Sequence, residues 1–164
     1  MNDLAYKLNS VLESTDKKLK TINEQQSAKK SSPDKWSSKQ ILGHLIDSSV
    51  NNMIRFVNAQ FKDDLVFYGY DQNKWVEAQN YKTAEWNSLI DLWKMNNLQI
   101  VRLIESIPND ILKKSTKNHN YDQIAWKELS KNESATLEYL IDDYIGHMKH
   151  HLRQILQMNV TEQL

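Results

Sequence analysis

Apolar residues recur at intervals of three and four along four separate segments of the chain, a spacing typical of amphipathic helices. The segments cover residues 3–26, residues 37–62, a stretch from residue 83 to a stop before Pro108, and residues 134–158. Only three glycines and two prolines occur among 164 residues, and no stretch alternates between apolar and polar residues long enough to predict a strand. The sequence therefore predicts an all-α protein, a four-helix bundle.

Short polar signals mark where the predicted helices begin and end. Residues 31–34 read Ser-Ser-Pro-Asp and interrupt the pattern after the first helix. Ser37, followed three residues later by Gln40, predicts a capping box at the start of the second helix. Thr83 is the expected N-cap of the third helix, and Pro108 ends it.

Two of the predicted connections are long. Residues 63–82 are aromatic and polar without helical periodicity, so this stretch is expected to be a crossover loop. Residues 109–133 form a second long, polar connector. Unequal connections of this kind predict long crossovers rather than a simple up-down-up-down bundle. The length of the chain and the absence of an internal repeat predict one domain over residues 1–164.

Charge and composition exclude several classes of protein. Lysine plus arginine and aspartate plus glutamate both number 21, so no basic excess is present to bind a nucleic acid. No apolar run approaches the roughly 20 residues that cross a bilayer, and the first seven residues lack the features of a secretory signal. A cytoplasmic protein without membrane or nucleic-acid partners is expected. Because the chain has no cysteine, metal ligands must be histidine, aspartate or glutamate.

Two histidines in the fourth predicted helix have the spacing of a metal-binding pair. His147 and His151 are four residues apart, so they project from the same face of the helix on successive turns. At 100° per residue, each lies only about 20° from an apolar residue seven positions earlier, so both should point into the bundle. Two imidazoles at this spacing are a common way to bind one metal ion.

A third histidine, His44, lies in the second predicted helix beside the apolar face. It begins a row of polar side chains that needs an internal cavity or water and that contains Ser48, Asn51, Asn52 and Arg55. If His44 met the other two histidines in the core, a bound metal ion would keep open positions, as in catalytic sites.

Spacing alone leaves other interpretations open. An isolated histidine on an inward face is usually a core residue that is hydrogen bonded. Met148 stands where the HExxH pattern of metalloproteases requires glutamate, so that mechanism is excluded. Haem binding is disfavoured, because two histidines on adjacent turns of one helix are poorly placed as opposite axial ligands.

At these residues the chain resembles the DinB-like (YfiT-like) superfamily. Residues 35–48 resemble the family's Trp-Ser segment and the histidine that follows it, and Arg55 falls where many members have an arginine. Residues 70–75 are similar to the Tyr-Asp and Trp segment of the family's crossover, and residues 136–140 lead into a closing HxxxH. These matches lie in the family's order along most of the chain.

The resemblance implies a four-helix bundle with a long crossover and a divalent metal ion, zinc or nickel, on His44, His147 and His151. It also implies a homodimer. Some family members transfer low-molecular-weight thiols, and many others are described as metal-dependent hydrolases. The thiol cosubstrate would come from outside, since the chain has none.

The function expected from these observations is that of a metal-dependent enzyme acting on a small molecule, by hydrolysis or by thiol transfer. No side chain is identified as the catalytic base. Arg55 is a candidate for binding an anionic group of the substrate, with a salt bridge as the alternative role. The other candidates for lining the pocket or for accepting hydrogen bonds from the imidazoles are Asp47, Ser48, Tyr70, Asp71, Trp75 and Asp143. The alternative is a dimeric bundle that binds a metal ion or ligand without catalysis.

Overall fold

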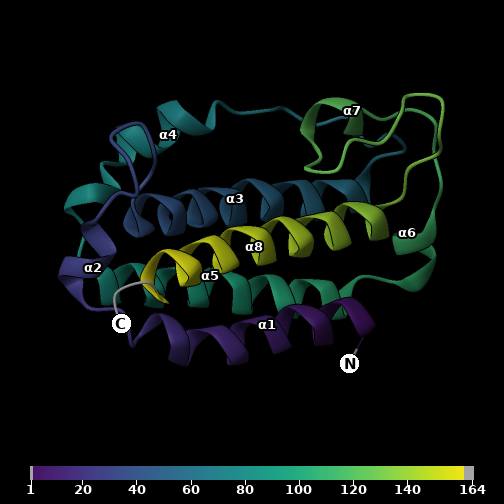
Figure 1. The fold of residues 1–164 in the computed structure, drawn as a ribbon. Coiled ribbons are helices and arrows are strands. Elements are labelled where there is room, and N and C mark those ends of the chain that lie inside the picture. Colours follow the sequence, from purple (N-terminus) through teal and green to yellow (C-terminus); the bar gives the residue numbers. More distant parts are fainter. Residues whose placement is uncertain (1, 161–164) are drawn as a thin grey trace.

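Four long helices pack side by side in the computed structural model, which describes residues 2–160 (Figure 1). They are α1 (Asp3–Leu19), α3 (Ser38–Asn58), α5 (Trp86–Ser106) and α8 (Leu137–Val160). Both α1 and α3 pack against α5 and α8, so α1 and α3 lie diagonally across the bundle. The prediction of an all-α four-helix bundle is confirmed. The predicted single domain includes residues 1 and 161–164, which lie outside the described residues.

Short helices and loops join the long ones. They are α2 (Glu24–Ala28), the 3₁₀ turns η1 (Ala59–Phe61) and η2 (Tyr81–Thr83), α4 (Gln72–Gln79), α6 (Asn109–Lys113) and α7 (Tyr121–Ile124). Within residues 2–160 no strand forms, although two isolated bridges join Leu65 to His119 and Thr116 to Ala135. None of the helices described is at once long enough and apolar enough to cross a membrane.

The two long connections differ in what they do. Residues 59–85 return along the whole length of the bundle, so that α3 and α5 run in the same direction (Figure 1). The connection from α5 to α8 leaves and re-enters at the same end of the bundle, where α6 and α7 lie. One connection therefore crosses over, and the other folds over one end.

The second long helix begins where the sequence predicts. Ser37 Oγ accepts a hydrogen bond from the Gln40 backbone N–H, and the Gln40 side chain accepts one from the Ser37 N–H. This reciprocal cap satisfies two of the N–H groups that a helix start leaves unpaired.

The first predicted helix is shorter than expected. The helix α1 ends at Leu19, and Asn23 starts α2 with a capping box of its own. Ile22 lies between the two helices and is buried, so it continues the apolar pattern outside any helix. Periodicity alone therefore overestimates the length of α1.

The N-cap of the third long helix lies two residues later than expected. Thr83 belongs to η2, and the N-cap of α5 is Glu85, whose side chain makes no capping bond. Instead, Glu24 of α2 accepts a hydrogen bond from the Trp86 N–H at 2.8 Å. A carboxylate from another helix thus caps α5, where the helix dipole favours a negative charge.

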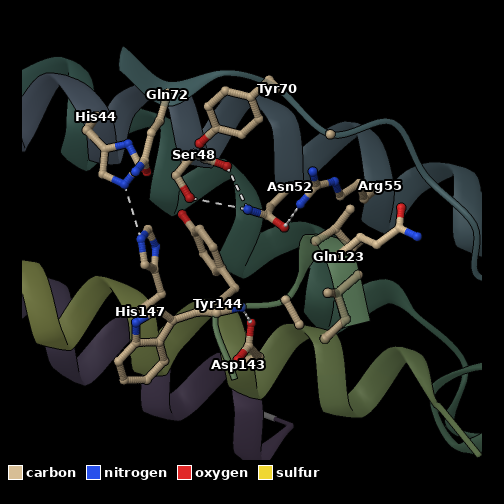
Figure 2. A pocket seen from close by; sticks show the side chains of 15 residues that line it. His44, Ser48, Asn52, Arg55, Tyr70, Gln72, Gln123, Asp143, Tyr144 and His147 are labelled. Atoms are coloured by element: carbon tan, nitrogen blue, oxygen red, sulfur yellow. Dashed lines mark hydrogen bonds between the residues drawn. The ribbon is translucent and has the colours of Figure 1, made fainter. Parts of the chain in front are cut away.

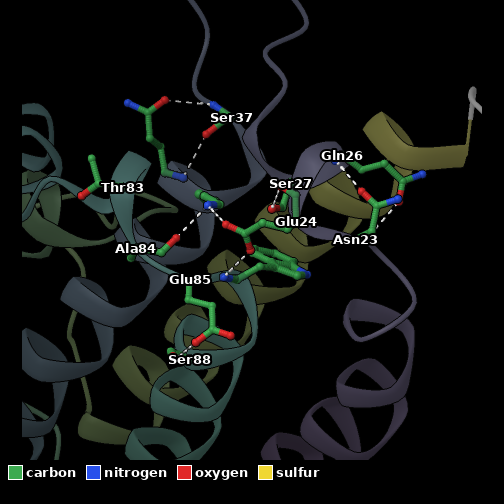
Figure 3. A network of polar contacts seen from close by, with 12 residues as sticks. Asn23, Glu24, Gln26, Ser27, Ser37, Thr83, Ala84, Glu85 and Ser88 are labelled. Atoms are coloured by element: carbon green, nitrogen blue, oxygen red, sulfur yellow. Dashed lines mark hydrogen bonds and ion pairs between the residues drawn. The ribbon is translucent and has the colours of Figure 1, made fainter.

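The buried Lys39 completes this junction, and Figure 3 shows the junction around Glu24 and Ala84. Lys39 Nζ pairs with Glu24 and also donates to the Ala84 carbonyl at 2.7 Å. The indole of Trp86 donates to the Leu19 carbonyl at 3.0 Å. These contacts tie α1, α2, α3 and α5 together at one end of the bundle and so hold the start of α3, on which His44 lies.

The crossover also contains more structure than predicted. Asp71 caps α4 by accepting hydrogen bonds from the Asn73 and Lys74 N–H groups. Asn80 ends α4 in the left-handed region, with φ of 52°. The loop expected for residues 63–82 is therefore wrong over α4, because an N-cap and packing override the weak periodicity.

Candidate metal centre

Three histidine rings meet where α3 packs against α8. His44 comes from α3, and His147 and His151 come from successive turns of α8. Their ring centroids lie 5.1 Å (His44–His147), 4.9 Å (His44–His151) and 4.7 Å (His147–His151) apart. One nitrogen from each ring can be chosen so that all three atoms lie within 4.8 Å of one another.

The two closest nitrogens face each other across the helix interface. His44 Nε2 lies 3.1 Å from His147 Nε2 (Figure 2). Imidazole nitrogens that bind one ion at about 2.1 Å on adjacent coordination positions lie about 3 Å apart. The donor set and this separation both fit a divalent cation.

Burial keeps these imidazoles neutral. Desolvation, followed by the effect of His151, lowers the pKa of His44 to about 4. Desolvation and the neighbouring histidines lower the pKa of His147 to about 3. Desolvation also lowers the pKa of His151. Neutral rings keep the lone pairs that a metal ion requires, so protons do not compete for these nitrogens at neutral pH.

A hydrogen bond to Gln154 orients the ring of His151. His151 Nδ1 lies 3.0 Å from Gln154 Oε1, and only a protonated nitrogen can donate to an amide oxygen. This bond leaves His151 Nε2 with its lone pair free. By contrast, His44 Nδ1 is buried without a hydrogen-bond partner. His150, the neighbour of His151, is exposed and lies against Trp126.

A cavity of about 230 Å³ opens beside His44 and His147 (Figure 2). It lies between α3 and α8 and is covered by the crossover and by the α5–α8 connection. Its walls are formed by His44, Ser48, Asn52, Arg55, Gly69, Tyr70, Gln72, Gln123, Ile124, Ala125, Trp126, Leu140, Asp143, Tyr144 and His147. The polar row predicted on α3 thus faces a cavity, apart from Asn51, which is not part of the wall.

Arg55 is buried in this wall, only 6% exposed. Its Nη1 donates to Asn52 Oδ1 at 3.4 Å and its Nη2 to the Tyr68 carbonyl at 3.0 Å. No carboxylate of residues 2–160 forms an ion pair with it, and burial lowers its pKa. The alternative role of a salt bridge is therefore not supported by the structure.

Asp47 is buried one turn after His44, and its partners come from the crossover. Its Oδ1 accepts hydrogen bonds from the Tyr81 hydroxyl at 2.6 Å and from Gln79 Nε2 at 3.4 Å. Its Oδ2 has no partner, and burial raises the pKa of this carboxyl. No imidazole hydrogen bond to Asp47 is present, so its contacts differ from those expected.

Asp143 also binds groups other than an imidazole. Its two carboxylate oxygens accept hydrogen bonds from the Trp126 and Lys127 backbone N–H groups, at 2.9 and 2.8 Å. Burial nevertheless raises its pKa. Asp143 therefore holds the α5–α8 connection against α8, where Trp126 lines the cavity.

The three aromatic and acidic candidates of the crossover separate in space. Tyr70 lines the cavity, as does Ser48 of α3, but Asp71 and Trp75 do not. Asp71 caps α4, and the Trp75 ring packs on Tyr70 from outside with centroids 5.2 Å apart. Desolvation raises the pKa of Tyr70 to about 12, so its hydroxyl stays protonated and can donate a hydrogen bond.

Sequence reasoning missed part of the wall. The Tyr144 hydroxyl donates to Asn97 Oδ1 at 2.5 Å, and both side chains are buried. Asn97, a polar residue on the apolar face of the third helix, was the one feature of the sequence that could have indicated a buried hydrogen-bond partner here. Gln72 lies in α4, and Gln123 and Ile124 lie in α7. Both short helices fall in stretches whose sequence has no helical periodicity, so spacing could not predict their positions.

Comparison with known proteins gives consistent matches. A family model described as the DinB superfamily matches residues 7–155. A protein of Bacillus subtilis (strain 168), named "Putative metal-dependent hydrolase YfiT", is 24% identical over 124 residues, which cover 76% of this chain and 64% of that protein. A Bacillus mycoides protein with the same descriptive name is 26% identical over 123 residues, or 75% of this chain and 64% of its own. The chain thus matches slightly less than two thirds of the length of these relatives.

A solved structure shares the fold. The structure of YfiT from Bacillus subtilis, whose description includes an unusual four-helix bundle topology, superposes with a TM-score of 0.74 at 23% identity. The match covers 96% of this chain and 86% of that one.

Proposed function

Because the chain belongs to the DinB superfamily, we propose that it is a metal-dependent enzyme in which His44, His147 and His151 hold one divalent ion. The observation that carries this proposal is the meeting of three neutral imidazoles, two of which, His44 and His147, line a cavity. A purely structural metal site is normally closed by four protein ligands, whereas no aspartate or glutamate within residues 2–160 joins this cluster.

The reaction we propose is hydrolysis of a small molecule or transfer of a low-molecular-weight thiol to one. A divalent ion supplies Lewis acidity and lowers the pKa of a small nucleophile. An all-imidazole donor set suits zinc or nickel among the available ions. The relatives named as metal-dependent hydrolases support this class of reaction.

Side chains at the histidine cluster and around the cavity would orient the metal ligands and the substrate. Gln154 fixes the His151 tautomer, and the crossover with Trp126 limits the access of water. Tyr70 keeps its proton and can donate to an oxygen of the substrate. Tyr144 is held by Asn97, so this part of the wall is rigid and can orient a bound molecule.

Metal binding is the first test. Loss of a residue that supports a ligand costs about 10–100-fold in metal affinity, so loss of a ligand itself should cost more. We expect His147→Ala and His151→Ala to weaken zinc and nickel binding by more than about 100-fold, measured by calorimetry on metal-stripped protein. His150→Ala is the matched control, because His150 is exposed beside the cluster. Equal affinities in all these proteins would contradict the site.

Turnover is the second test. Metal-loaded protein should convert members of a panel of esters, amides and thiol–electrophile pairs, and His147→Ala should lose this activity while His150→Ala keeps it. Stoichiometric metal binding without turnover on any of these compounds would instead support a bundle that binds metal without catalysis.

We also propose a homodimer, on the basis of family membership. Light scattering on the purified protein measures its mass, and 19.3 kDa would contradict the proposal.

A further inference from the structure

The cavity contains a buried positive charge that no protein anion neutralises. Arg55 is 6% exposed, and no carboxylate among the described residues pairs with it. Tyr70 and Tyr121 lie near it, but desolvation raises the pKa of both hydroxyls, so neither is an anion at neutral pH. A buried charge without a partner is destabilising, and proteins retain such groups where they serve function.

The guanidinium also has unused hydrogen-bonding capacity. An arginine side chain carries five N–H donors, and the described contacts use one on Nη1 and one on Nη2. Arg55 is part of the cavity wall, and its head group lies beside Asn52 (Figure 2). The planar fork of a guanidinium matches an oxyanion with two parallel hydrogen bonds.

The polar row on α3 leads from this charge to the histidine cluster. Ser48 and Asn52 lie one and two turns after His44 on the same side of α3, and both line the cavity. Asn52 is eight residues from His44, about 12 Å along a helix axis. Because Arg55 reaches back to Asn52, its head group lies about 10 Å from the cluster.

We propose that Arg55 binds an oxyanion group of the substrate, a carboxylate or a phosphate, through paired N–H donors. The substrates are then elongated small molecules with a negative charge about 10 Å from the atom that reacts beside the histidines. This inference rests on the proposed function for the reacting end of the molecule. The oxyanion site itself requires only Arg55 and the cavity.

The experiment uses cobalt-loaded protein and a homologous series of mercaptoalkanoates. The thiol of each compound binds at the cobalt ion and is followed by its charge-transfer absorption, while the carboxylate reaches toward Arg55. Matched mercaptoalcohols lack the charge, and matched mercaptoalkylphosphonates distinguish a phosphate-type site from a carboxylate site. A charge-assisted hydrogen bond corresponds to about 10–100-fold in affinity.

We expect acids of suitable length to bind about 10–100-fold more tightly than the matched alcohols. Affinity should be highest for the chain whose ends span about 10 Å. Arg55→Met should remove the preference for the charged compound and leave thiol binding intact. Arg102→Met is the control, because Arg102 is exposed on α5, and it should keep the preference.

Because no carboxylate among the described residues pairs with Arg55, its replacement leaves no buried charge uncompensated, so Arg55→Met should fold. If it does not, Arg55→Lys is measured instead. Because lysine keeps the charge without the planar fork, a smaller preference supports the proposal, and an unchanged one overturns it. Equal binding of acid and alcohol to the wild type, or a preference that survives in Arg55→Met, also overturns it.

A metal-free measurement separates this inference from the proposed function. Simple alkanoates should raise the melting temperature of the metal-stripped wild type and of Arg102→Met, but not that of Arg55→Met. If the alkanoates act in this way and cobalt does not bind, the oxyanion site stands and the metal site fails. If cobalt and thiols bind but the alkanoates have no effect on the wild type, the oxyanion site fails and the metal site stands.

Discussion

Two glycines inside long helices provide a matched pair of substitutions. Gly43 lies in α3 next to His44, and Gly146 lies in α8 next to His147. Replacing glycine by alanine inside a helix normally stabilises by about 1 kcal/mol, so both variants share this gain. They differ in what the new methyl group would meet.

At Gly43 the methyl group has no room. It would lie 2.1 Å from Tyr81 Cδ2 and 2.2 Å from Tyr81 Cγ. These atoms are at the base of a ring that is 6% exposed, and its hydroxyl is bound to Asp47 at 2.6 Å. Moving the ring costs about 1–3 kcal/mol for overpacking. It also costs about 1–3 kcal/mol when the buried Asp47 carboxylate loses this donor.

At Gly146 the methyl group is accommodated. It would lie 3.3 Å from Trp126 Cζ3, and Trp126 is a loop residue with 43% of its surface exposed. A shift of a few tenths of an ångström is easy for such a side chain. The gain in helix propensity should therefore be retained.

We expect Gly43→Ala to lower the free energy of unfolding by about 3 kcal/mol and Gly146→Ala to raise it by up to about 1 kcal/mol. For a chain of this length, 1 kcal/mol corresponds to about 2–4 °C in melting temperature. Urea denaturation followed by circular dichroism on metal-free protein measures both. If Gly43→Ala were as stable as Gly146→Ala, the close approach of Tyr81 to α3 would be refuted.

Two further predictions concern the buried polar groups. The pKa values of His44 and His147 fall to about 4 and 3, whereas an unfolded histidine has a pKa of about 6.5. Between about pH 6.5 and 4, therefore, the unfolded chain takes up protons on these residues that the folded chain does not. Stability of the metal-free protein is therefore complete above pH 6.5 and should fall by about 1.4 kcal/mol per pH unit for each histidine as the pH drops toward 4; a flat urea midpoint between pH 7 and 5 would contradict this. Tyr144→Phe leaves the buried Asn97 oxygen without its donor and should cost about 1–3 kcal/mol, whereas Tyr139→Phe, a control that loses an exposed hydrogen bond, should change urea stability little.

Helix periodicity and capping signals determined much of this protein from the sequence alone. The four long helices, the Ser37–Gln40 cap of α3 and the inward direction of His147 and His151 all follow from spacing along one helix. They are local properties, because each is set by residues within one or two turns. The polar row on the second helix made His44 the third candidate, the family resemblance implied that it joins the other two, and the structure places its ring beside theirs.

Tertiary structure decided the features that depend on a second segment. The position at which α5 begins depends on Glu24, a residue of α2 that lies 62 positions before Trp86 and accepts a hydrogen bond from its N–H. Asp47 accepts a hydrogen bond from the Tyr81 hydroxyl. Asp143 accepts hydrogen bonds from two backbone N–H groups of the α5–α8 connection. Spacing showed on which side of its helix each carboxylate lies, but not which loop would cover that side.

The same reasoning explains Arg55. Its position in a polar row was readable from the sequence, but a row of this kind can face solvent, a salt bridge or a cavity. The crossover decides between these surroundings, because its Tyr68 carbonyl accepts a hydrogen bond from the guanidinium and its Tyr70 lines the cavity. Periodicity specifies the direction of a side chain relative to its own helix axis, whereas its surroundings depend on how distant segments pack against that axis.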